Sequence, residues 1–79
     1  MELRELKLLF DSGALREAHI VRLFDAWTLE CTRPGRDSVT MTTSRTGDIR
    51  RFKSLDAAYE AARAVGFQRA SVMANANNF

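Results

Sequence analysis

The sequence predicts a small α+β domain, an antiparallel β-sheet meander with two helices packed on one face. Residues 54–66 show a capped, alanine-rich pattern typical of a helix, and residues 15–52 contain several segments in which polar and apolar residues alternate. The 79 residues leave room for one hydrophobic core and no second one. The predicted element order is α-β-β-β-β-α-β, because short connections favour pairing between successive strands. Residues 1–74 then form a single domain, and residues 75–79 form a flexible tail.

The first helix is predicted at Glu2–Phe10, where leucines and Phe10 recur at helical spacing on one face. Gly13 follows as a stop signal. A helix this short is not stable in isolation, so we expect its apolar face to dock on the rest of the domain.

Four segments of alternating residues follow, separated by short turns. They are Leu15–Leu23, Trp27–Thr32, Ser38–Thr43 and Asp48–Phe52. A Pro-Gly pair suits the centre of a type II turn between the second and third segments. Ile49 and Phe52 have opposite parity, which predicts a bulge or the end of the strand near Arg50 and Arg51.

The alternation also predicts which strand face meets the helices. Trp27, Leu29 and Cys31 share the parity of a core face. The opposite face carries a row of polar residues, which we interpret as ordinary strand formers in contact with solvent. These residues are Thr28, Glu30, Thr32, Ser38, Thr40 and Thr42.

The second helix has the clearest local signals of the chain. Ser54 stands where an N-cap would accept a bond from a free backbone N–H, and Asp56 adds a negative charge in the first turn. Gly66 suits the left-handed residue that ends a helix, with Phe67 packing back onto the last turn. The final strand is predicted at Phe67–Met73.

Composition excludes several classes of protein. No apolar run approaches the ~20 residues that a bilayer-crossing helix needs. The first ten residues carry interspersed charges and no cleavage site typical of a signal peptide, so the expected compartment is the cytoplasm. The single cysteine, Cys31, excludes an internal disulfide and a multi-cysteine zinc site.

No constellation of catalytic residues is evident. His19, the only histidine, could act as a general base with a partner, but the spacing of serine and cysteine residues indicates none. Cys31 alternates with apolar neighbours and is interpreted as a small buried hydrophobic residue. The glycines are spread one to a turn, and metal-ligand spacing is absent. We therefore expect a protein that is not an enzyme and has no metal or cofactor.

Positive charge is concentrated in the middle of the chain. The net charge is +2, but residues 32–53 contain six basic and only two acidic side chains. The basic residues are Arg33, Arg36, Arg45, Arg50, Arg51 and Lys53. Arginine-bearing strands and loops could contact nucleic-acid phosphates or an acidic partner surface. The alternative is a solvated face, partly neutralised by Asp37 and Asp48.

A protein interface is the other candidate site. Phe24 lies beside a turn, so we expect it to be exposed, and an exposed aromatic residue can anchor a protein interface. A core of this size gives only a few kcal/mol of stability, so pairing into a homodimer would be an ordinary way to gain more.

The sequence resembles two known families, one through longer motifs and the other through the order of its predicted elements. The opening ELKLLFDSGAL, the tryptophan-centred strand, the hairpin and RRFKSLDAAYEAARAVGF resemble ParC-type partition-associated proteins of plasmids and integrated conjugative elements, over Leu3 to about Val72. That likeness implies no catalytic residues and an accessory role in maintaining mobile DNA, through DNA or a partition protein. Separately, the order α-β-β-β-α resembles a double-stranded RNA-binding domain, in which Arg50, Arg51 and Lys53 would stand near the phosphate contacts. The sequence departs from that domain because its basic residues precede the second helix, it has no Gly-Pro-x-His loop, and an extra strand follows.

Together these observations predict a small non-enzymatic binding module of a bacterial plasmid or mobile element, accessory to DNA maintenance, whose basic hairpin contacts DNA or RNA. The alternative is a protein-interaction adaptor or homodimeric inhibitor that acts on a protein partner, for example against a host defence system. Steep salt dependence of binding would indicate the first, and salt-insensitive self-association would indicate the second.

Overall fold

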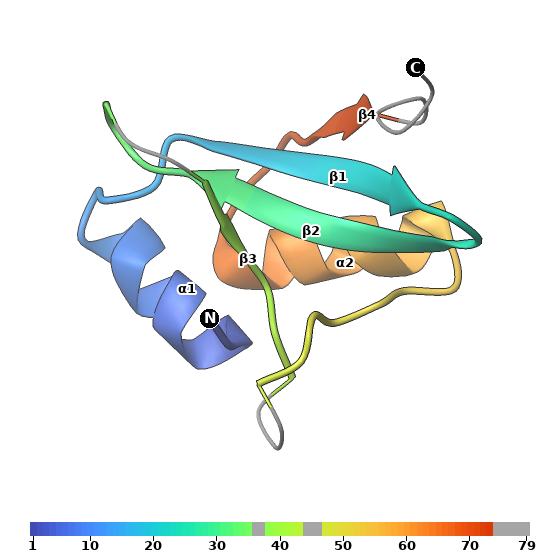
Figure 1. Ribbon diagram of the computed structural model, residues 1–79. Helices are drawn as coiled ribbons and strands as arrows, with labels where there is room; N and C mark the ends of the chain where they lie inside the picture. The colour runs from blue at the N-terminus through green and yellow to red at the C-terminus, as the bar shows by residue number, and fades with distance from the viewer. Residues whose placement is uncertain (36–37, 44–46, 74–79) are drawn as a thin grey trace.

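The computed structural model describes residues 1–35, 38–43 and 47–73, which form two helices and a four-stranded sheet (Figure 1). The α+β class predicted from the sequence is confirmed. In chain order the elements are α1 (Leu3–Asp11), β1 (Glu17–Leu23), β2 (Ala26–Thr32), β3 (Ser38–Thr40), α2 (Leu55–Val65) and β4 (Ser71–Met73). The predicted tail at 75–79 lies outside the described residues.

The sheet has the strand order β3-β2-β1-β4 and is mixed. β1 and β2 form an antiparallel hairpin in register from Glu17 opposite Thr32 to Leu23 opposite Ala26, and β3 pairs antiparallel with β2. β4 instead pairs parallel with β1, which corrects the all-antiparallel expectation. The reason is that α2 starts beside the β1–β2 turn and carries the chain back along the sheet, so the last strand enters at the end where β1 begins.

The segment expected as a fourth strand, Asp48–Phe52, forms only two isolated bridges in place of a regular strand. Ile49 pairs with Thr42, whereas Phe52 pairs with Trp27 of β2. The segment therefore changes partner between these two residues, and the opposite parity of Ile49 and Phe52 marks the point of change. The order of regular elements is consequently α-β-β-β-α-β.

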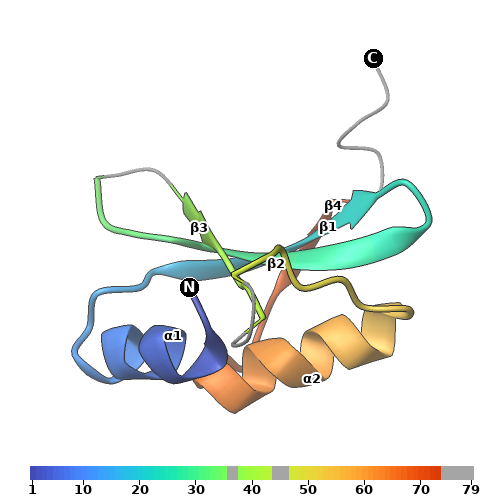
Figure 2. The same cartoon turned by 60° about the horizontal axis from the view of Figure 1, so that its bottom comes forward.

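Both helices lie on one face of the sheet, as predicted (Figure 2). α1 buries Leu6, and α2 buries Ala58, Ala62 and Val65 against the hairpin strands. Cys31 is fully buried in the same core, in agreement with its interpretation as a small hydrophobic residue. The docking of α1 on α2 explains how a nine-residue helix remains stable.

The predicted exposure of Thr28 was wrong. Its register places it on the same face as Glu30, as expected, but it is only 4% exposed. Its hydroxyl donates a bond of 3.1 Å to the carbonyl oxygen of Val21 on the neighbouring strand. Because that bond satisfies the polar group, Thr28 can be buried at little cost.

The local signals at both ends of α2 are confirmed. The Ser54 hydroxyl accepts a bond of 3.1 Å from the backbone N–H of Ala57. Gly66 ends the helix with φ +137°. Phe67 then turns into the core, where its ring meets Phe10 of α1 edge to face at 4.8 Å. That inward turn keeps Phe67 and the residues immediately after it out of the sheet, so β4 starts later than predicted.

Candidate nucleic-acid interface

Four exposed basic side chains are carried by two segments that meet at one end of the sheet. Arg22 lies near the end of β1, and the other three lie on the segment that leads from β3 to α2. We call this set the basic surface; its members are Arg22, Arg50, Arg51 and Lys53. The segments are joined through β2, because Trp27 pairs with Arg22 on one side and with Phe52 on the other.

Arg22 is held in place by two contacts. Its Nε–H donates a bond of 3.0 Å to the carbonyl oxygen of Phe24. Its guanidinium carbon lies 5.7 Å from the centre of the Trp27 ring, within the range of a cation–π interaction. The backbone turn and the ring together restrict a side chain that would otherwise sample many rotamers.

Arg50 is arranged in a similar way on the other side of β2. Its guanidinium carbon lies 5.2 Å from the centre of the Phe52 ring. Phe52 is buried, and its N–H and C=O bond to Trp27 at 2.8 and 2.9 Å. Each of the two arginines therefore lies over an aromatic ring, and the backbones of the two aromatic residues are paired.

None of the four cations forms an ion pair with another residue in the described part of the chain. Their charge is therefore presented to solvent. Exposed cations without carboxylate partners at one end of a sheet raise the local concentration of anionic ligands.

The six basic residues that the sequence predicted as one surface do not all lie at the same place in the structure. Arg50, Arg51 and Lys53 are all exposed and follow one another closely on the segment that leads to α2. Arg33 is half-buried and follows β2 at its far end, roughly 20 Å along the strand from Trp27. Arg36 and Arg45 lie outside the described residues. Sequence reasoning missed Arg22, because it stands in the acidic first third of the chain and only strand pairing brings it to this surface.

Phe24 projects from the two-residue turn between β1 and β2. Its side chain is 77% exposed, which confirms the expected exposure, and its φ is +59°. The backbone carbonyl of Phe24 accepts the bond from Arg22, so the turn that carries this ring lies next to one cation of the basic surface.

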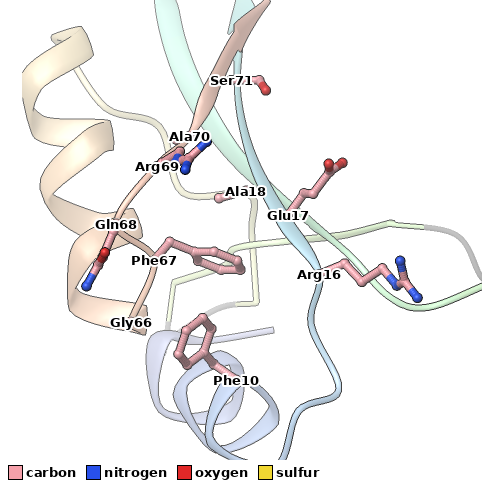
Figure 3. Close-up of a pocket in the computed structure, with 10 residues that line it drawn as sticks. All are labelled: Phe10, Arg16, Glu17, Ala18, Gly66, Phe67, Gln68, Arg69, Ala70 and Ser71. Atoms are coloured by element: carbon pink, nitrogen blue, oxygen red, sulfur yellow. The ribbon is translucent and has the colours of Figure 1, made fainter.

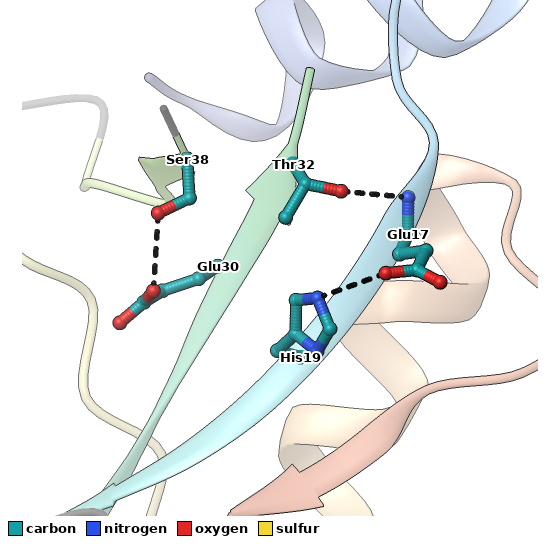
Figure 4. Close-up of polar contacts among 5 residues, drawn as sticks. All are labelled: Glu17, His19, Glu30, Thr32 and Ser38. Atoms are coloured by element: carbon teal, nitrogen blue, oxygen red, sulfur yellow. Dashed lines mark hydrogen bonds and ion pairs between the residues drawn. The ribbon is translucent and has the colours of Figure 1, made fainter. Parts of the chain in front are cut away.

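The sheet face away from the helices is polar and carries acidic groups (Figure 4). His19 Nε2 lies 3.5 Å from the carboxylate of Glu17, and the hydroxyl of Ser38 donates to Glu30 at 3.3 Å. Thr32 accepts a bond of 3.1 Å from the backbone N–H of Glu17. Among the described residues, no three metal-ligating side chains gather at one place.

A cavity of about 740 Å³ opens between the start of β1 and the chain that leads into β4 (Figure 3). Its apolar wall is formed by the ring pair Phe10 and Phe67. Arg16 and Arg69 also line it, but Figure 3 shows the Arg16 side chain extending away from the two rings. The two arginines therefore do not converge on one point inside the cavity.

Cys31 is the remaining candidate nucleophile. Burial, with a smaller contribution from the charge of Glu30, raises the pKa of its thiol to about 11. The reactive species of cysteine is the thiolate, so at neutral pH this side chain is an inert part of the core.

Comparisons of the chain with protein-family models, with curated proteins and with solved structures find no match. A function therefore has to be inferred from the chain's own residues. No helix in the described ranges is long and apolar enough to cross a membrane.

Proposed function

We propose that the protein is a small non-enzymatic module that binds nucleic acid by contacting phosphates with the basic surface. The observation that carries the proposal is the group of four exposed cations, two of them held on aromatic rings and none neutralised by a carboxylate among the described residues. The resemblance to ParC-type proteins supports an accessory role in maintaining a bacterial plasmid or mobile element, in the cytoplasm.

The aromatic contacts favour phosphate binding for a physical reason. A guanidinium that lies over a ring still has N–H donors available to a ligand. Because Arg22 and Arg50 are already restrained, the entropy cost of ordering these side chains on a phosphate is smaller. The open sheet face is less suitable, because Glu17 and Glu30 would repel a phosphate backbone there.

The chemistry of the other candidate groups supports a binding protein over an enzyme. The thiol of Cys31 is protonated at neutral pH and has no exposed surface. His19 meets a carboxylate, but no serine or cysteine is paired with it by a bond in the described structure.

The test is the salt dependence of binding to short labelled DNA and RNA duplexes. Removing one phosphate-binding side chain should lower the slope of log K against log salt by about 0.9 on DNA. The variant Arg50→Ala/Arg51→Ala should therefore reduce the slope by roughly 2 between about 50 and 200 mM salt.

The matched control is Arg16→Ala/Arg69→Ala, which removes two exposed arginines beside the cavity and changes the net charge equally. This control should keep most of the wild-type slope. Equal reductions in both variants would mean that only net charge matters. Absence of wild-type binding at low salt would refute the proposal.

The second candidate function is a protein-interaction adaptor or homodimeric inhibitor. It is favoured by the apolar edge of the sheet, where Val72 and Met73 of β4 are 48% and 46% exposed. Salt-insensitive self-association of the wild type in sedimentation experiments, abolished by a charged residue at Val72, would support it over nucleic-acid binding.

A further inference from the structure

Phe24 occupies a position that folding alone does not explain. It is the one non-glycine residue in the described ranges with a positive φ, and its ring is mostly exposed. A two-residue hairpin turn with a positive φ at its first central residue strongly prefers glycine there. The phenyl ring therefore neither relieves backbone strain nor fills the core.

The turn that carries this ring lies next to the basic surface. The carbonyl of Phe24 holds Arg22 in place. The bridge between Trp27 and Phe52 brings the segment that enters α2 to the same end of the hairpin, and Lys53 follows Phe52 on that segment. A ligand that contacts Arg22 would consequently pass close to the turn that carries the ring.

The other two aromatic rings of this region, those of Trp27 and Phe52, are each covered by an arginine side chain. Trp27 is half-buried beneath Arg22, and Phe52 is buried and covered by Arg50. Of these three rings, Phe24 is the one that offers a free aromatic face next to the basic surface.

We propose that Phe24 stacks on an unpaired base, so that the ligand of the basic surface is single-stranded nucleic acid or a duplex with unpaired bases. This inference rests on the proposed function. An aromatic side chain can stack on any base, because every base has a π-face, whereas the bases of an intact duplex are stacked on each other. In this proposal the cations bind the phosphate backbone of the nucleic acid. The Phe24 ring gives a preference for unpaired bases over an intact duplex.

The experiment compares binding of a labelled single strand and of the duplex with the same sequence. Phe24→Gly removes the ring and suits the positive φ of the turn, so the variant should fold. We expect it to bind the single strand about tenfold more weakly, to bind the duplex as the wild type does, and to keep its salt slope. Phe24→Trp should bind the single strand as tightly as the wild type does, because it keeps a stacking ring.

The control is Leu8→Ala, which removes an exposed apolar side chain from α1, and it should bind both ligands as the wild type does. If Phe24→Gly binds the single strand normally while the salt slope falls in Arg50→Ala/Arg51→Ala, the stacking role is wrong and the proposed function stands. If the wild type binds neither form at low salt, both are wrong. Weaker self-association of Phe24→Gly would then assign the ring to a protein interface.

Discussion

Replacing Gly66 with alanine should lower the free energy of unfolding by about 2 kcal/mol, because both the backbone and the space at this position require glycine. The φ of Gly66 is +137°, which L side chains rarely adopt. A Cβ placed there would lie 2.5 and 2.6 Å from Cδ1 and Cε1 of Phe10, so the Phe10 ring would have to move.

The magnitude follows from three contributions. A positive φ in an L-residue costs about 1–2 kcal/mol. Displacing Phe10 from its edge-to-face contact with Phe67 removes a further 0.5–1.5 kcal/mol, roughly. The lower entropy of alanine in the unfolded chain returns about 0.4–1 kcal/mol. In a domain whose core supplies only ~3–5 kcal/mol, the net change is large.

Chemical denaturation monitored by tryptophan fluorescence measures this change, with Gly13→Ala as the control. Gly13 also has a positive φ, +81°, but no heavy atom lies within 4 Å of its ideal Cβ. Gly13→Ala should therefore cost roughly 0–1.6 kcal/mol, with a central value near 0.8, since only the backbone contribution remains.

A double-mutant cycle isolates the contribution of the ring. In a Phe10→Ala background, Gly66→Ala should cost no more than Gly13→Ala does in the wild type, because the clashing atoms are gone. If Gly66→Ala and Gly13→Ala were equally destabilising in the wild type, the steric part of this reasoning would be refuted.

Two further predictions concern the cap of α2 and the buried thiol. Ser54→Ala should destabilise the protein by about 1 kcal/mol, whereas Ser54→Asp should retain most of the stability; equal destabilisation by both would contradict the capping role. The pKa of the Cys31 thiol is about 11 in the folded protein, against a reference value of 9.0. The folded state therefore holds the thiol proton more tightly than the unfolded state does. The stability that results is complete below pH 9.0 and is lost as the pH rises toward about 11. Across that range the wild type should lose on the order of 2 kcal/mol more than Cys31→Ala in denaturation experiments, and parallel curves would show that the thiol does not titrate as inferred.

The sequence by itself determined the elements whose signals are local. The capping bond of Ser54 spans three residues, and Gly66 marks the helix end directly, so both could be recognised without knowledge of the fold. The alternation of β2 likewise placed Leu29 and Cys31 in the core. The position of Phe24 at a turn was enough to predict its exposure.

Only the tertiary structure decided which distant segments lie side by side. The parallel pairing of β4 with β1 depends on where α2 delivers the chain, and Phe52 pairs with β2 because its ring enters the core there. Arg22 and Arg50 come to the same end of the sheet for the same reason, because Arg22 pairs with Trp27 and Arg50 lies over Phe52, which also pairs with Trp27. Capping bonds and residue alternation act over a few neighbouring positions, whereas strand order and the composition of the basic surface depend on how the whole core packs.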